Sequence, residues 1–199
     1  GHTAEGMTKR LPVWHQLQDL LRHAKTLGPY QALKTEAQAI ETQRALLAEP
    51  DPVRPLLDKV VDLLRQALNA KLATYKRAFA QQQQQLSSDT EWNKLSDSQR
   101  ADLTGRHHLS AQADPPLGTP EQLQDALDDC DLDHWVSKAD ALPSRFEAAR
   151  MAAVQLLKPN VVHLSLPKRT LNNTEELKAW LADVEQLVAE KLKQGPVAL

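Results

Sequence analysis

Apolar residues recur at intervals of three or four along most of the chain, which is the spacing of one face of an α-helix. This pattern predicts a first helix over residues 13–27, which Gly28 and Pro29 end. A second helix starts near Tyr30 and continues to the sequence "EPDP" at 49–52. Two prolines in four residues cannot continue a helix interior, so the chain must turn there.

The longest predicted helix follows this turn and extends to about residue 85, into a glutamine tract at 81–85. We expect it to pack antiparallel against the second helix as a projecting hairpin. Each fully buried leucine is worth on the order of 2 kcal/mol, and one short facing helix cannot cover the whole apolar stripe. The stripe is therefore the expected partner or oligomer contact, and it consists of Leu57, Val60, Leu64, Leu68 and Leu72. The glutamine tract is either a solvated continuation of the helix or a polar self-association seam.

Residues 87–158 carry further helical patterns and predict a small bundle. One helix covers 88–109, with Trp92 among its apolar anchors. Thr119 is placed to cap a helix that starts at Pro120. A third helix runs from Asp133 to Leu157, and Pro143 should break or kink it.

The pattern changes to alternation in "VVHLSLPKRT", residues 161–170, which predicts a β-strand. Its apolar face consists of Val162, Leu164 and Leu166, alternating with Val161, His163 and Ser165. A capped helix from Asn173 to Lys193 follows, and after Gly195 the tail "PVAL" can lie parallel to the strand in a β-α-β element. Two strands are too few for a stable sheet, so we expect a third strand from the rest of a longer protein or from a partner.

Composition agrees with a helical protein, because aromatic residues make up only 4% and Leu, Ala and Gln are abundant. The expected fold is mostly α, with a long helical hairpin, a small helical bundle and a short C-terminal β-α-β element. The expected segments are a tag remnant at 1–7, the hairpin or coiled coil at 8–86, the bundle at 87–158 and the β-α-β unit at 159–199. A single cysteine, Cys130, suits a reducing compartment, and no apolar run approaches a bilayer span. The sequence thus predicts a cytoplasmic chain without a membrane partner.

Motifs of catalysis and metal binding are missing from the sequence. There is no phosphate-binding loop, no H-E-x-x-H or C-x-x-C and no serine nucleophile elbow, so we expect no catalytic residue, cofactor site or small-molecule substrate. The best metal candidate is a calcium-loop spacing of Asp129, Asp131, Asp133 and Asp140. His134 stands where such a loop needs glycine, so one aspartate is expected instead to cap the helix that carries Trp135. The adjacent His107 and His108 cannot chelate one ion from a regular helix.

A basic row offers an alternative function, binding to nucleic acid. It comprises Arg65, Lys71, Lys76 and Arg77, within a stretch that has no acidic residue between Asp62 and Asp89. These cations could contact phosphates, but the net charge of −2 gives no attractive field and the row has no interleaved aromatic stacking platform. A solvated helix face is the favoured interpretation.

The second half of the chain resembles the C-terminal region of BrxC, the large P-loop ATPase of BREX bacteriophage-exclusion systems. The resemblance rests on "EWNKLSDSQRADLTGRHHL", "GTPEQLQDALDD", "HWVSKADALPSRFEAAR" and above all "VVHLSLPKRTLNNTEELKAWLADVEQLVAEKLKQGPVAL". It implies a piece of a longer bacterial ATPase whose ATP and magnesium site lies outside this sequence. It also implies other BREX proteins, or further copies of the chain, as partners, and contact with DNA through that assembly. The sequence therefore predicts a non-catalytic interaction and assembly region.

Overall fold

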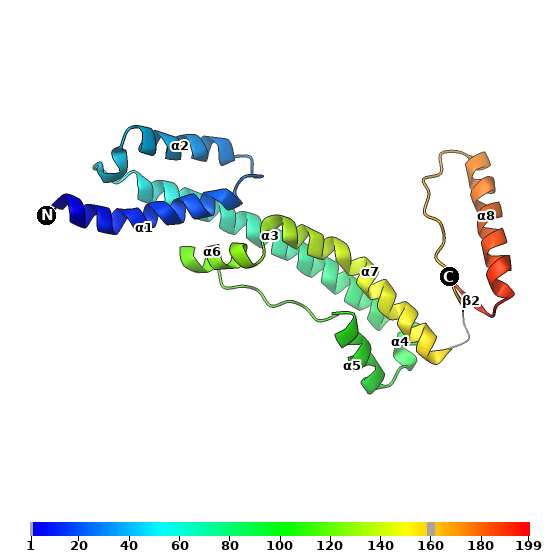
Figure 1. Ribbon diagram of the computed structural model, residues 1–199. Helices are drawn as coiled ribbons and strands as arrows, with labels where there is room; N and C mark the ends of the chain where they lie inside the picture. Colours follow the sequence, from blue (N-terminus) through cyan, green and yellow to red (C-terminus); the bar gives the residue numbers. More distant parts are fainter. Residues whose placement is uncertain (1, 159–161) are drawn as a thin grey trace. The chain divides into compact units, whose positions relative to one another are not determined.

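A computed structural model of the chain describes residues 2–158 and 162–199. Helices make up most of this part, and its two strands have two residues each, so the fold is mostly α as the apolar spacing predicts (Figure 1). The chain divides into two compact units. Unit 1 comprises residues 1–79 and 111–141, and unit 2 comprises 80–110 and 142–199. The units interleave along the chain, unlike the consecutive segments expected from the sequence.

The described part of unit 1 is built from three α-helices, one 3-10 turn and parts of two longer helices. In chain order these are α1 (His2–His23), α2 (Tyr30–Thr42), the 3-10 turn η1 (Ala45–Leu47), the first part of α3 (Val53–Ser87), α6 (Pro120–Asp129) and the first part of α7 (Leu132–Leu157). Helix α1 begins earlier than predicted and continues through Pro12. Residues 2–7 of the segment that we assigned to a tag remnant thus form the first turns of α1, although their polar sequence shows little helical periodicity.

The apolar stripe of α3 belongs to the core of unit 1. Leu57, Val60, Leu64 and Leu68 are 0% exposed and Leu72 is 5% exposed. Other buried residues of the unit come from α1, α2, α6 and α7, and include Leu17, Leu20, Leu33, Ile40, Leu123, Leu127 and Trp135. The expectation that this stripe forms an exposed partner contact is therefore wrong. It assumed one short facing helix, whereas several elements of the same chain supply the cover.

Arg10 of α1 holds the connection between α2 and α3 in place. Its Nη1 donates to the carbonyl oxygens of Leu46 at 3.0 Å and Ala48 at 2.7 Å. The guanidinium also pairs with Glu49 and lies 3.9 Å from Asp51, and the side chain is only 16% exposed. Charge-assisted bonds of this kind are stronger than neutral ones. The turn at "EPDP" is thus fixed by α1 as well as by its own prolines.

Local capping explains where three helices begin. Thr119 and Gln122 form the capping box of α6, with Pro120 at its first position, as predicted. Asp131 Oδ1 accepts the backbone N–H of His134 at 2.8 Å and so caps α7, which carries the buried Trp135. This confirms the capping role expected for one of the aspartates. Ser96 and Gln99 form a further capping box, which splits the single helix predicted over 88–109.

Unit 2 contains the remainder of α3 and α7, two short helices and the C-terminal elements. The short helices are α4 (Thr90–Lys94) and α5 (Asp97–Arg106), and the C-terminal elements are β1 (Val162–His163), α8 (Thr174–Leu192) and β2 (Val197–Ala198). Helix α7 continues through Pro143 without the predicted break. The buried residues Phe146, Ala149 and Ala153 follow Pro143 on α7, so packing of this face outweighs the loss of one backbone hydrogen bond.

Glu91 links α4 to the residue that follows α7. Its carboxylate lies 3.0 Å from Lys94 Nζ and 3.7 Å from Lys158 Nζ. The hydrogen bond from Lys94, helped by the charge of Lys158, lowers the pKa of Glu91 below its usual 4.5, although partial burial opposes this shift. A carboxyl group whose pKa is lower in the folded state stabilises the fold above the unfolded pKa, and this stability disappears as the pH falls through the folded pKa.

We expect Glu91→Gln to reduce the loss of stability on acidification. Urea unfolding at pH 6 and at pH 3.5 gives the wild-type difference in midpoint, and this difference should shrink in the variant. Lys94→Met should shrink it as well, because it removes the main cause of the pKa shift. Equal pH dependence in all three proteins would contradict this role for Glu91.

Candidate interaction surface

The C-terminal segment folds as a strand, a helix and a second strand. β1 and β2 pair in parallel, with Val162 opposite Val197 and His163 opposite Ala198. The backbone N–H of Val162 donates to the Pro196 carbonyl at 2.7 Å, and that of Leu164 donates to the Ala198 carbonyl at 3.0 Å. The predicted parallel pairing of the tail "PVAL" is confirmed. Val161, which we also assigned to the strand, lies outside the described residues.

The first strand is much shorter than the predicted range of 161–170. Regular strand structure covers only Val162 and His163, so Leu166 lies beyond it. β2 offers only two residues for pairing, and Pro167 has no N–H to extend a ladder. The carbonyl of Pro167 instead accepts the indole N–H of Trp180 at 2.8 Å. This bond ties the segment after β1 to α8.

A side-chain cap defines the start of α8, and a glycine follows its end, as the sequence predicted. Asn173 Oδ1 accepts the backbone N–H of Glu176 at 2.8 Å, which confirms the predicted cap. The carboxylate of Glu176 reaches back to the backbone N–H of Asn172, also at 2.8 Å. At the other end Gly195 has a φ of 153°, a conformation that favours glycine and directs the chain into β2.

The apolar face of α8 is not covered within the described part of the chain. No residue of α8 is buried. Its largest exposed apolar side chains are Leu177 at 40%, Leu181 at 50%, Leu187 at 36% and Leu192 at 56%. The sequence predicted that this stripe covers the apolar side of the strand, but a pair of two-residue strands is too small to bury it. Exposed apolar surface of this kind is typical of a site that another segment covers.

The small sheet also has unpaired backbone on both sides. Among the described residues it has two strands, so each strand keeps one free edge. The Nε2 atom of His163 in β1 is buried without a hydrogen-bond partner in the same part of the chain. Free edges and an unpaired buried polar atom both indicate a surface that is incomplete by itself.

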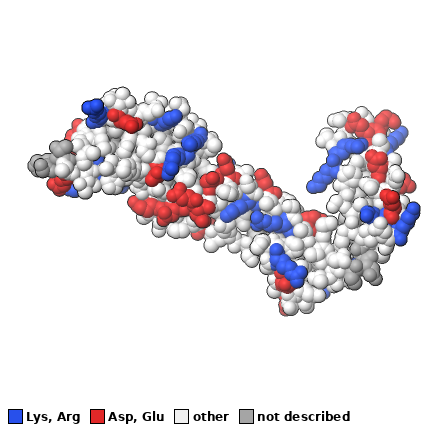
Figure 2. Space-filling view, viewed as in Figure 1, with Lys and Arg blue, Asp and Glu red and all other residues white. Residues whose placement is uncertain are grey.

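The basic row lies on α3 in unit 1, and part of it is already occupied by contacts within the chain. Arg65 Nε donates to the Leu117 carbonyl at 3.0 Å, and Lys76 pairs with Asp114. Arg77 makes a long contact of 3.4 Å to Thr74 Oγ1, and Lys71 is half-buried. The loop before α6 thus pairs Lys76 with a carboxylate and Arg65 with a carbonyl oxygen, although the sequence left both cations free. Figure 2 shows acidic side chains gathered over α6, which belongs to the same unit and would repel a polyanion.

Other site classes find little support in the described residues. Residues 2–158 and 162–199 contain no group of three or more histidine, cysteine, aspartate or glutamate side chains placed to hold a metal ion. No helix in this part of the protein is both long enough and apolar enough to cross a membrane.

Comparison with known proteins adds no family assignment. The chain matches no protein-family model, no curated protein and no solved structure. The geometry of the strand–helix–strand segment is therefore the main guide to function.

Proposed function

We propose that the chain is a non-catalytic protein-interaction and assembly region, and that residues 162–199 are its docking segment. The observation that carries this proposal is the apolar face of α8, of which no residue is buried, beside a sheet with free edges. The leucines of this face are 36–56% exposed, so covering the rest of one of them is worth about 1 kcal/mol, and several together give a partner a clear energetic gain. Hydrogen bonds to the free strand edge would fix the orientation of that partner.

The proposed occupant is a third β-strand, added beside β1 by a partner protein or by the remainder of a longer parent chain. Val162 and Leu164 direct their N–H groups toward β2. Backbone N–H groups of successive strand residues point to opposite sides, so the N–H of His163 points to the free edge. An added strand supplies an acceptor there and extends the sheet under α8.

The sequence resemblance gives the biological setting of the proposal. The parent is a P-loop ATPase of a BREX system in the bacterial cytoplasm, with its ATP and magnesium site elsewhere in that parent. The partners are other BREX proteins or further copies of the chain, and DNA is reached through the assembly. Capture of purified BREX proteins on the immobilised chain, together with sedimentation of the chain alone across a concentration series, tests this setting.

Changes to the internal strand pair should weaken both folding and docking. Deletion of residues 196–199 removes β2, and Leu164→Pro removes the N–H that donates to Ala198. We expect either change to increase hydrogen exchange of α8 and to lower partner capture. Unchanged exchange and capture after both changes would show that the tail does not contribute to a docking sheet.

A substitution at the free edge should separate docking from folding. His163→Pro removes the outward N–H while leaving the N–H groups of Val162 and Leu164, which donate to the β2 strand and its preceding residue, in place. We expect capture or self-association to fall at least tenfold, with hydrogen exchange of α8 little changed. His163→Ala is the matched control, because it removes the imidazole but keeps the backbone donor. Equal capture by His163→Pro and wild-type protein would argue against strand addition at this edge.

The nucleic-acid alternative makes a different set of predictions. If DNA binding were the main activity, the isolated chain would bind duplex DNA with an affinity that falls steeply with salt. Lys71→Ala and Arg77→Ala would each weaken it. If the chain did not bind duplex DNA at low salt, the nucleic-acid function would be excluded and the docking function would be favoured.

A further inference from the structure

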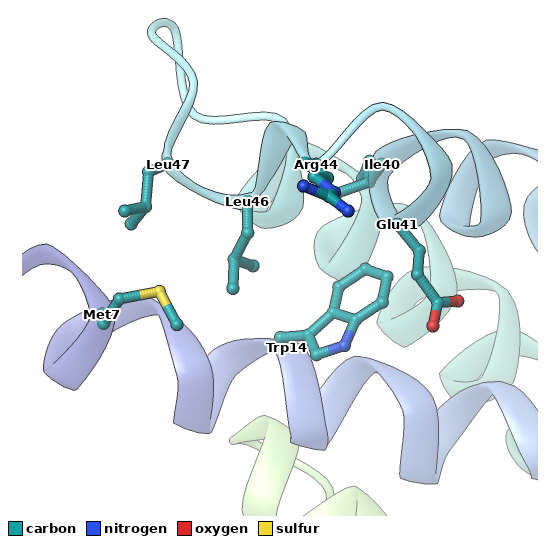
Figure 3. Close-up of a pocket in the computed structure, with 7 residues that line it drawn as sticks. All are labelled: Met7, Trp14, Ile40, Glu41, Arg44, Leu46 and Leu47. Carbon is teal, nitrogen blue, oxygen red and sulfur yellow. The ribbon is translucent and has the colours of Figure 1, made fainter. Parts of the chain in front are cut away.

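Unit 1 contains an open pocket that the sequence patterns did not indicate. It has a volume of about 330 Å³ and lies among α1, α2 and η1 (Figure 3). Its lining residues are Met7, Trp14, Ile40, Glu41, Arg44, Leu46 and Leu47. The volume is at the lower end of the range for small-molecule sites, which begins at roughly 300 Å³.

The walls of the pocket are mainly apolar and come from three separate elements. Figure 3 shows Met7 and Trp14 rising from α1 toward Leu46 and Leu47 on the opposite side. The hydrogen bonds that Arg10 donates to backbone carbonyl oxygens fix the segment that carries Leu46 and Leu47. Close packing continues at Gly6, where a Cβ atom would lie 3.3 Å from Leu47 Cδ2. The pocket is therefore preformed rather than assembled on binding.

Among the described residues that line this pocket, Arg44 is the one cation. Its backbone is left-handed, with a φ of 53°, a conformation that costs a side chain-bearing residue about 1 kcal/mol or more. Figure 3 shows its guanidinium between Leu46 and Ile40, on the side of the pocket facing Trp14. Among the described residues the guanidinium has no hydrogen bond and no ion pair. The carboxylate of Glu41 also lines the pocket, but Figure 3 places it on the far side of the indole from Met7.

We propose that this pocket binds a small organic anion, a carboxylate with an aliphatic chain. The chain lies against Met7, Trp14 and Leu46, and the carboxylate pairs with Arg44. A planar guanidinium matches the geometry of a carboxylate, and its other neighbours in the pocket are mostly apolar. This proposal is independent of the docking segment, which belongs to unit 2.

Octanoate and octanol test the proposal as a charged and an uncharged probe of equal chain length. The indole N–H of Trp14 gives a nuclear magnetic resonance signal that is assigned by its loss in Trp14→Phe. We expect octanoate to shift this signal saturably and to bind at least fivefold more tightly than octanol. Equal affinities would overturn the anion site, and an unperturbed Trp14 signal at saturating octanoate would overturn the pocket itself.

Four variants examine the two charges at the pocket separately. Arg44→Asn removes the cation but tolerates the left-handed backbone, and should weaken octanoate binding about fivefold. Arg44→Lys keeps the charge but loses the planar guanidinium, and should retain only part of the affinity. Glu41→Gln removes a repulsive carboxylate and should strengthen octanoate binding without changing octanol binding. Glu36→Gln is the control, because Glu36 lies on the same helix but pairs with Lys59 outside the pocket. An octanoate affinity that is the same in Arg44→Asn and wild-type protein would refute the role of Arg44.

Discussion

The double substitution Leu64→Ala and Leu68→Ala should leave unit 1 largely unfolded at room temperature. Both leucines are 0% exposed, and they lie one helical turn apart on α3. A buried leucine replaced by alanine typically costs about 3 to 5 kcal/mol, because a cavity remains in the core. The two costs are not independent for neighbouring residues, yet a combined loss of about 5 kcal/mol approaches the whole stability of many domains. Circular dichroism at 222 nm during urea titration measures the loss.

A matched pair on the exposed side of the same helix provides the control. Gln66 and Asn69 are exposed, and replacing both with alanine should leave the unfolding midpoint unchanged or slightly raised. If the leucine double variant kept its stability but lost self-association, the stripe would be an intermolecular contact and its burial within unit 1 would be refuted.

Phe146→Ala should have the largest single-residue effect on unit 2. Phe146 is 0% exposed and is the largest of the fully buried side chains. Truncating a buried phenylalanine to alanine costs about 3 to 5 kcal/mol. Hydrogen exchange should therefore increase in α4 and α5, which belong to the same unit. Thermal unfolding and exchange mass spectrometry provide the measurements.

Phe146→Leu separates the size of the side chain from its apolar character. Leucine retains most of the buried apolar surface, so we expect this variant to lose less than half as much stability as Phe146→Ala. Equal, small losses in both variants would mean that the side chain packs loosely and that α7 does not organise this unit.

Helical spacing alone was enough to identify most of the fold. Leu57, Leu64 and Tyr75 share one face of α3 because intervals of three and four return to the same side of a helix. The caps at Thr119 and Asn173 were also recognisable, since their side chains act on backbone groups only three residues away. The parallel pairing of the tail followed from the need of a lone strand for a partner and from the glycine at 195.

The remaining errors arose where distant contacts outweigh local preference. Pro143 lies inside α7 because burial of its neighbours Leu142 and Phe146 compensates for a missing N–H. Pro12 also lies inside a helix, α1, although its neighbours Leu11, Val13 and Trp14 are not buried. The helix boundary at Ser96 is a different case, because Ser96 starts α5 through a local bond to Gln99 that the spacing of apolar residues does not reveal. Periodicity shows which face of α3 is apolar, but it does not show that elements of the same chain cover this face.

The candidate sites likewise differ in how far local sequence reveals them. The apolar face of α8 is visible in the sequence, whereas its lack of cover depends on the length of the two strands. The pocket beside Arg44 depends on three elements meeting, and no local motif marks it. The pairing of Lys76 with Asp114 likewise joins residues that lie 38 positions apart.

The interleaving of the two units affects how the protein can be synthesised and dissected. Unit 1 needs the segment 111–141, so it is complete only after residues 80–110 of unit 2 have already left the ribosome. During that interval α1, α2 and the first part of α3 lack the leucines of α6 and Trp135 of α7. No single truncation point yields either unit whole. A fragment of unit 1 alone would require an engineered linker from Phe79 to Ala111 that replaces the intervening segment.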